Sequence, residues 1–312
     1  MKPLRKNVAI AFDGGGLRGV ITARALSMLE SALAKPMHKI IGLTAGTSTG
    51  SIIAAAVAAE LTAKQILNLY VDMGKSIFRK SLRTTFWPLT TFRYPRPPLT
   101  QALEEHIGNL KMGDVWNKKP PIDLVIPTFD LVENRSCFIK SWKEEYKDWR
   151  VIDAVQASSA APTYFSVLNG RYTDGGVGSF NNPCFLAAYE IHSCLNWKPE
   201  ETTLISLGTG RAMKHLEVGQ AVKFRPLQWL SPLLDAFGRS ADDQQVHIVD
   251  TFFKDLDFRR FQVDMKEEIP LDDSSQIDTM IEYGERMGSM ILADQFDRSM
   301  GVKPTVAPLH AN

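Results

Sequence analysis

The chain has 312 residues, of which 44% are hydrophobic and 23% charged, and its formal net charge is +1. This composition is typical of a globular protein with a large α/β core, and the balanced charge excludes a global attraction to nucleic acid or anionic membrane. No apolar stretch is long enough for a signal peptide or a membrane span, and the three cysteines have no metal or redox spacing. We therefore expect a cytoplasmic protein without metal or cofactor and without a nucleic-acid partner.

A buried strand is predicted at residues 7–12, followed at once by the glycine-rich loop Asp13 to Gly19 and by a helix from Val20 to about Ala34. The loop matches the Gly-x-Gly-x-x-Gly pattern of dinucleotide-binding folds. Those folds place an acidic residue near the end of the second strand, about 20 residues on. Here the second strand runs into Thr44 and Ala45. A nucleotide-binding module using the Gly14–Gly19 loop is therefore the last of the alternatives.

The next apolar run leads into Gly46-Thr47-Ser48-Thr49-Gly50, a Gly-x-Ser-x-Gly pattern before a helix. In a nucleophile elbow, Gly46 and Gly50 leave no Cβ to collide with the flanking strand and helix, and Ser48 is exposed at the helix N-terminus. There the helix dipole and the Thr49 N–H could stabilise an oxyanion. The alternative is a plain turn capped by a serine. The right-handed crossover rule predicts that both strands are parallel, which brings the glycine loop and Ser48 to one sheet edge.

Residues 74–103 carry six basic residues and no acidic one, with aromatic residues and prolines between them. The residues concerned are Lys75, Arg79, Lys80, Arg83, Arg93 and Arg96, with Phe78, Phe86, Trp87, Phe92 and Tyr94. One hypothesis is an inserted, mobile cover that contacts anionic lipid headgroups, with aromatic side chains at the interface, and makes the protein peripheral at the membrane. The alternative is a solvated loop folded over the core.

The rest of the chain continues the alternation of strands and helices. Helices are predicted at residues 62–78, 100–108, 151–160, 183–195, 231–253 and 275–295, and strands at 122–128, 136–141, 203–207 and 258–263. We expect one α/β domain over residues 1–296, with an inserted loop at 74–103 and a disordered tail at 297–312.

A serine nucleophile needs a base. The chain has six histidines: His38, His106, His192, His215, His247 and His310. None follows a predicted strand as a hydrolase histidine does, and His215 is the least implausible of them. Asp174, in Asp174-Gly175-Gly176, is the other candidate, although Asp-Gly is also the strongest short signal for a hairpin turn. The residues by themselves leave the base open.

Four segments in this order resemble the patatin-like phospholipase family: Asp13 to Gly19, Gly46 to Gly50, the small-residue block Ala157 to Phe165, and Asp174 to Gly176. The resemblance spans roughly residues 7–300. It implies a three-layer α/β/α fold with a mostly parallel central sheet. It also implies metal-free hydrolysis of lipid esters, the substrate being a phospholipid, a lysophospholipid or a glycolipid.

The same resemblance implies a catalytic dyad in which Ser48 is the nucleophile and Asp174 the base. The oxyanion hole would be formed by Gly14, Gly15 and Gly16, with Arg18 in support. A carboxylate with a pKa near 3.9 is a weak base, so Asp174 must gain basicity from desolvation or act mainly by orienting the hydroxyl. We expect the acyl chain to lie against the block from Ala157 to Val167.

Three further hypotheses remain. An acyltransferase would use the same acyl-enzyme with another acceptor. A signal-activated phospholipase effector would be opened by a cyclic nucleotide or a partner. A catalytically idle protein would bind lipid through residues 74–103 and turn nothing over.

Overall fold

The computed structural model describes residues 1–78, 84, 90–212 and 219–297. Its main sheet has the strand order β4-β3-β2-β1-β6-β8, and β5 also pairs with β3. Its strands are β1 (Asn7–Phe12), β2 (Leu43–Gly46), β3 (Asp123–Asp130), β4 (Arg135–Lys140), β5 (Tyr172–Asp174), β6 (Thr202–Leu207) and β8 (Asp257–Phe261). A small second sheet pairs β7 (Arg211–Ala212) with β9 (Asp264–Met265).

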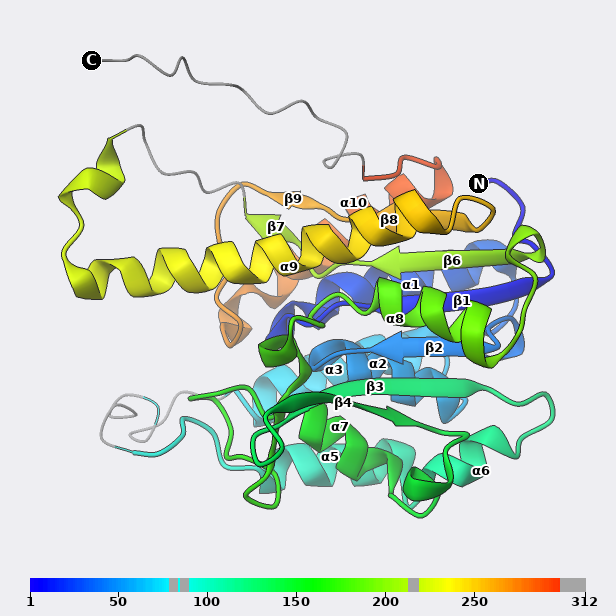
Figure 1. Cartoon of the computed structure of the whole chain (residues 1–312), viewed down its shortest axis with the longest axis horizontal. Helices are drawn as coiled ribbons and strands as arrows, with labels where there is room; N and C mark the ends of the chain where they lie inside the picture. Colours follow the sequence, from blue (N-terminus) through cyan, green and yellow to red (C-terminus); the bar gives the residue numbers. More distant parts are fainter. Residues whose placement is uncertain (79–83, 85–89, 213–218, 298–312) are drawn as a thin grey trace.

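Helices cover both faces of the main sheet (Figure 1). The α-helices are α1 (Gly19–Leu33), α2 (Thr49–Ala58), α3 (Ala63–Ser76), α5 (Pro97–Ile107), α6 (Met112–Trp116), α7 (Val151–Ser158), α8 (Cys184–Tyr189), α9 (Leu230–Phe252) and α10 (Ile277–Leu292). The shorter turns are η1 (Gly16–Arg18), η2 (Met37–Lys39), η4 (Glu144–Tyr146), η5 (Gly175–Gly178), η6 (Glu190–Cys194), η7 (Pro199–Glu201), η8 (Gln220–Lys223), η9 (Pro226–Trp229) and η10 (Ser274–Gln276).

Strand β1 shows how the sequence creates the three layers. Successive side chains of a strand point to opposite faces. Val8, Ile10 and Phe12 enter the core beneath α1, α2, α3, α5, α7 and α10, whereas Ala9 and Ala11 face α8 and α9. Small alanines let α8 lie close to the sheet, and bulky residues fill the deeper core on the other side. The predicted three-layer α/β/α fold is thus confirmed.

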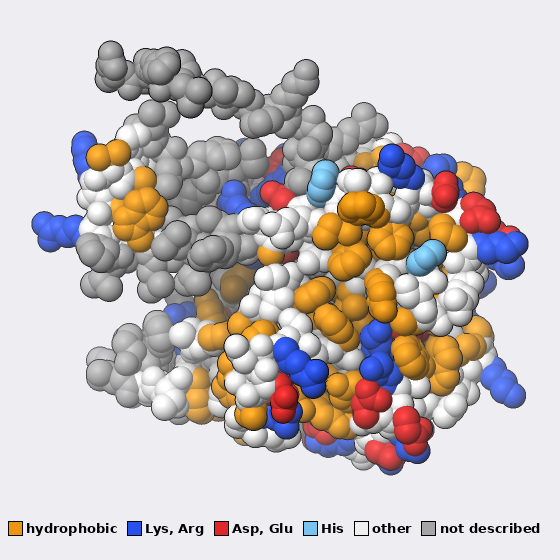
Figure 2. Space-filling view, viewed as in Figure 1, with side chains coloured by type: hydrophobic (Ala, Val, Ile, Leu, Met, Phe, Trp, Pro, Cys, Tyr) orange, Lys and Arg blue, Asp and Glu red, His pale blue; other side chains and the backbone are white. Residues whose placement is uncertain are grey.

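The outer layer formed by α8 and part of α9 carries hydrophobic side chains at its surface (Figure 2), among them Tyr189 at the end of α8. Across the residues that the structure describes, none of the helices is long and apolar enough to cross a membrane.

Strands β1, β2, β3, β6 and β8 are parallel, so their carboxyl ends share the edge that lies on the left in Figure 1. The predicted parallel pairing of the first two strands is confirmed: Phe12 lies opposite Gly46. Strand β5 pairs with the last three residues of β3, which lie beyond the residues that pair with β2. Asp174 lies opposite Thr128. Because β4 occupies the other side of β3 there, β5 lies in line with the end of β2.

Some elements differ from the sequence predictions. The second strand begins at Leu43, after the turn η2 at residues 37–39. Helix α5 begins at Pro97 rather than at Thr100, since proline fits the first turn of a helix, where its missing N–H costs nothing. Strand β5 was not predicted; it is three residues long and depends on β3, a partner distant in the sequence.

The predicted domain boundaries stay a prediction. Asp297, the first residue of the predicted tail, is held by its N–H to the carbonyl oxygen of Arg260 and by an ion pair with Arg211. Residues 298–312 lie outside the described residues.

Candidate active site

Ser48 stands between β2 and α2 with φ 53° and ψ −121°, a backbone conformation that non-glycine residues rarely adopt. Such strain, about 1–3 kcal/mol, persists only where the surroundings impose it. A Cβ on Gly46 would lie 2.1 Å from the carbonyl oxygen of Gly50, and a Cβ on Gly50 would lie 2.2 Å from that of Phe12. Both positions therefore require glycine, as the elbow pattern predicted.

Neighbouring hydroxyl groups hold the elbow in this geometry. The buried Ser158 Oγ accepts a hydrogen bond from the N–H of Ser48 at 3.0 Å and donates one to the carbonyl oxygen of Pro127 at 2.6 Å. Ser51 Oγ donates to the carbonyl oxygen of Ser48 at 2.6 Å. Ser158 lies in the predicted small-residue block, but its bond across to Ser48 was not foreseen.

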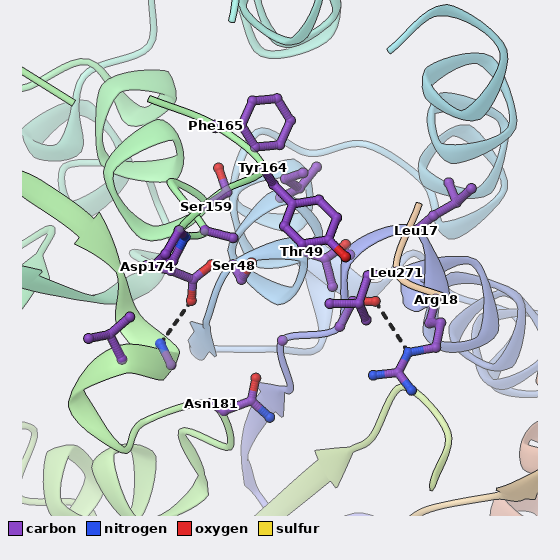
Figure 3. A pocket seen from close by; sticks show the side chains of 18 of the residues that line it. Leu17, Arg18, Ser48, Thr49, Ser159, Tyr164, Phe165, Asp174, Asn181 and Leu271 are labelled. Atoms are coloured by element: carbon purple, nitrogen blue, oxygen red, sulfur yellow. Dashed lines mark hydrogen bonds between the residues drawn. The ribbon is translucent and has the colours of Figure 1, made fainter. Parts of the chain in front are cut away.

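Asp174 is buried at the end of β5, where its Oδ1 accepts a hydrogen bond from the Gly176 N–H at 2.8 Å (Figure 3). The Ser48 side chain lies next to this carboxylate in the same cavity (Figure 3). Burial raises the pKa of Asp174 to about 6, against the smaller lowering effects of Ser48 and Gly176. Asp174 has thus gained basicity by desolvation, one of the two possibilities that the sequence left open. It is followed by η5 rather than by the second strand of a hairpin.

The glycine loop approaches Ser48 closely, since a Cβ on Gly14 would lie 3.3 Å from the Ser48 Cβ. However, the Gly14 N–H donates to the carbonyl oxygen of Asn181 at 2.9 Å, so it is not free to bind an oxyanion. This corrects the expectation for Gly14. In the described part of the chain, the N–H groups of Gly15, Gly16 and Thr49 have no hydrogen-bond partner. These three donors are the ones left for an oxyanion.

Arg18 is bound to the same loop. Its Nε donates to the carbonyl oxygen of Gly15 at 3.4 Å (Figure 3), and the Arg18 N–H donates to the same oxygen at 3.2 Å. Thr209 Oγ1 donates to the carbonyl oxygen of Gly14 at 2.7 Å. Arg18 is therefore fastened to the glycine loop, and its support of an oxyanion stays a prediction.

A buried ion pair lies at the start of the glycine loop. The Arg260 guanidinium binds both carboxylate oxygens of Asp13, at 2.7 and 2.5 Å, and also Ser206 Oγ at 2.8 Å. Sequence reasoning missed this pair. The available signal was a pair of arginines, Arg259 and Arg260, in an apolar strand, because a charged residue in a buried strand needs a partner.

Asp242 on α9 makes a second polar link to the loop. It accepts hydrogen bonds from Asn181 Nδ2 and from the Asn182 N–H, both at 3.0 Å. Burial, with a smaller contribution from the Asp13 charge, raises the pKa of Asp242 to about 7. Sequence reasoning missed this contact as well, and no local signal on α9 indicated it.

A cavity of about 840 Å³ joins these groups: Ser48, Asp174, Gly14–Gly16, Arg18 and Asn181 all line it. Most of its remaining wall is apolar. The apolar residues include Leu17, Ile52, Met73, Ile77, Leu99 and Leu271, together with Ala161, Pro162, Tyr164 and Phe165 from the small-residue block. Figure 3 shows Tyr164 and Phe165 on one side of Ser48 and Asn181 on the other. The cavity can thus hold a long apolar group against the serine.

The described part of segment 74–103 differs from the membrane-cover hypothesis. Phe78 and Tyr94 are buried and pack edge to face with ring centroids 5.2 Å apart, so these two aromatic side chains do not lie at an interface. Arg93 forms an ion pair with Asp272 at 2.5 Å, and Arg96 donates to the carbonyl oxygen of Gln156 at 3.1 Å. These residues fasten the segment to the core.

Several residues named for the site lie outside the described residues: Arg79, Lys80, Arg83, Phe86 and Trp87 of the segment, and the alternative base His215. Among the residues that are described, no group of three His, Cys, Asp or Glu side chains could hold a metal ion.

Comparisons with known proteins give a consistent result. The family model described as patatin-like phospholipase matches residues 10–188. Calcium-independent phospholipase A2-gamma of Oryctolagus cuniculus is 28% identical over 295 residues, which cover 85% of this chain and 35% of that protein. Patatin-like protein 2 of Arabidopsis thaliana is 26% identical over 321 residues, covering 86% of this chain and 77% of that protein.

The cGAMP-activated phospholipase of Pseudomonas aeruginosa is 29% identical over 213 residues, covering 64% of this chain and 61% of that protein. The chain thus spans only about a third of the length of the rabbit phospholipase that it matches.

Proposed function

The chain belongs to the patatin-like phospholipase family, and on that premise we propose that it is a lipid acyl hydrolase with Ser48 as nucleophile and Asp174 as base. The observation that carries the proposal is the meeting of three features in one largely apolar cavity. These are a strained serine, a buried carboxylate whose pKa is raised to about 6, and N–H groups that have no hydrogen-bond partner among the described residues.

In the first half-reaction, the ester carbonyl lies over Ser48 and the acyl chain along the apolar wall. Asp174 accepts the hydroxyl proton as Ser48 Oγ attacks the carbonyl carbon. The N–H groups of Gly15, Gly16 and Thr49 stabilise the oxyanion that forms. When the intermediate collapses, the carbon–oxygen bond to the alcohol breaks. Asp174 returns the proton to the departing oxygen, and the acyl group stays on Ser48.

In the second half-reaction, Asp174 takes a proton from a water molecule that attacks the acyl-enzyme. The bond between the acyl carbon and Ser48 Oγ breaks, the proton returns to Oγ, and a free fatty acid leaves. Attack by an alcohol or thiol instead of water would give acyl transfer, so products must be analysed with and without an added acceptor.

The direct test is to incubate wild-type protein and the Ser48→Ala variant with a total lipid extract and identify the products by mass spectrometry. Fatty acids together with lysolipids or deacylated glycolipids are expected from the wild type alone. Equal release from both proteins would overturn the proposal, as would tight binding of NAD that is independent of Ser48 without any ester cleavage.

A signal-activated enzyme is a second candidate, favoured by the similarity to the cGAMP-activated phospholipase over 213 residues. Its signature would be negligible hydrolysis by the protein alone and strong hydrolysis after addition of a cyclic dinucleotide. The same rate with and without the nucleotide would exclude that nucleotide as the signal.

Contact with a membrane surface through residues 74–103 and a cytoplasmic location stay predictions. In the described part of that segment, exposed Lys75 is a cation suited to such a contact. Vesicle binding that weakens with salt and with Lys75→Glu would support the contact.

A further inference from the structure

A second groove, of about 460 Å³, lies beside the catalytic cavity. It runs between the turn after β3, the segment around Ser166 and the loop after β5. All the described residues that line it are uncharged. A groove without charge suits hydrocarbon rather than a phosphate or an ammonium group.

The two hollows share part of their wall, since Pro162, Phe165 and Val177 line both of them. Strand β5 separates them at its end: Thr173 lines the groove and Asp174 lines the cavity. Consecutive residues of a strand point to opposite sides, which explains this division. The groove therefore begins one residue away from the proposed base.

Three polar groups along the groove are already hydrogen-bonded within the protein. Thr173 Oγ1 donates to the carbonyl oxygen of Ala160 at 2.8 Å, and the carbonyl oxygen of Thr163 accepts from the Arg93 N–H at 2.8 Å. The carbonyl oxygen of Ser166 accepts from the Arg96 guanidinium. The surface that the groove offers to a ligand is therefore mainly carbon.

Apolar side chains at the groove are exposed to water in this structure. Leu131 is 48% exposed, Val167 38% and Val177 48%. A cluster of exposed apolar residues that borders a ligand cavity is typical of a binding surface for an apolar ligand.

We propose that this groove holds the second acyl chain of a diacyl lipid while the chain to be cleaved lies in the cavity beside Ser48. This inference rests on the proposed ester hydrolysis. The two chains of a diacyl lipid leave neighbouring carbons of one glycerol, so they need two apolar hollows that meet close to the reacting ester. The wall that the two hollows share at Pro162 and Val177 provides that arrangement. A monoacyl lipid would leave the groove empty.

The groove offers a matched pair of variants on the turn after β3. Leu131 lines the groove, whereas its neighbour Val132 is 67% exposed and does not line it. Leu131→Asp and Val167→Asp place a carboxylate in the groove, and Val132→Asp adds the same charge beside it. Both positions on the turn are exposed enough for the substitution to leave the fold intact.

The measurement is kcat/KM on diheptanoylphosphatidylcholine and on heptanoyl-lysophosphatidylcholine, each as monomers so that membrane binding plays no part. The ratio of the diacyl to the monoacyl value should fall at least about tenfold in Leu131→Asp and Val167→Asp. It should keep the wild-type value in Val132→Asp. A wild-type ratio in both groove variants, or an equal fall in Val132→Asp, would overturn the proposal.

A binding measurement separates this inference from the proposed function. In Ser48→Ala protein, a dialkyl ether lipid should bind more tightly than the monoalkyl ether, and Leu131→Asp should abolish this preference even if no ester is ever cleaved. If the wild type hydrolyses both esters but Leu131→Asp keeps the preference for the dialkyl ether, the groove proposal is wrong and the proposed function stands. Absence of hydrolysis by the wild type would defeat the proposed function.

Discussion

Two buried carboxylates at the same edge of the sheet have opposite surroundings. Asp13 follows β1 and is bound through both oxygens by Arg260, which is itself buried. Asp174 ends β5, and the groups that lower its pKa are neutral: the Ser48 hydroxyl and the Gly176 N–H. Burial raises the pKa of both groups.

The difference indicates two roles for one side-chain type. An arginine at contact distance holds the charge of Asp13 in place, so this carboxylate suits a structural task at the root of the glycine loop. Asp174 has no such cation in the described chain, and with a pKa of about 6 it can accept and return a proton near neutral pH. The same edge of the sheet therefore carries one carboxylate paired with an arginine and one without a cation among the described residues.

The largest expected effect separates the two carboxylates by activity. Ser48→Ala and Asp174→Asn should each lower kcat on a lipid ester by about 10⁴-fold or more, because nucleophile and base act as one unit. Circular dichroism should show an intact fold. Full activity of Asp174→Asn, together with loss of activity in His215→Ala, would show that the dyad is assigned wrongly.

Stability should respond to the other carboxylate. Asp13→Asn leaves the Arg260 charge buried without its partner, and we expect the free energy of unfolding to fall by about 3–5 kcal/mol. Urea denaturation measures this loss. The double variant Asp13→Asn with Arg260→Met should recover part of it, since neither charge is then buried. A loss below about 1 kcal/mol in the single variant would remove the contrast with Asp174.

Asp174→Asn should act in the opposite direction. The folded pKa of about 6 lies above the ordinary value of 3.8, so the folded state binds the proton more tightly. The ionised carboxylate therefore destabilises the fold fully above pH 6, and this penalty disappears as the pH falls to about 4.

Replacing the carboxylate by a neutral amide removes the penalty. Unfolding of Asp174→Asn at pH 8 should cost on the order of 2–3 kcal/mol more than that of the wild type, with little difference near pH 4. A variant that is less stable than wild type at both values would show that Asp174 is a structural residue like Asp13.

The smallest effect is the pH profile of the reaction. A base must be ionised to act, so kcat/KM should rise about tenfold per pH unit below pH 6 and level off above it. Stopped assays between pH 4.5 and 8 on a monomeric ester measure this curve. A profile that levels off near pH 4 would mean that Asp174 keeps an ordinary pKa.

The sequence predicted what depends on local geometry. The elbow and the glycine loop could be read because glycine is required where backbones approach closely, at Gly46 and Gly50 above all. Asp174 needed the family resemblance, since it reaches Ser48 only through the pairing of β5 with β3.

Contacts between distant parts of the chain were beyond prediction. The carbonyl oxygen of Asn181 accepts a hydrogen bond from the Gly14 N–H, and Arg260 forms an ion pair with Asp13. Neither partner is near the glycine loop in the sequence. The pattern of residues 74–103 likewise showed that the segment is basic and aromatic, but not whether its side chains point to the core or to solvent. Phe78 and Tyr94 in fact pack into the core. A composition pattern does not say which side chains the core will enclose.

The route by which Ser48 and Asp174 meet has a consequence for protein synthesis. Ser158 ties the Ser48 N–H to Pro127, and the next residue, Thr128, pairs with Asp174, so β3 carries both groups. The elbow leaves the ribosome long before Asp174, and a nascent chain carries the serine without its base. On the proposed mechanism, Ser48 therefore has no base until β5 has joined the sheet.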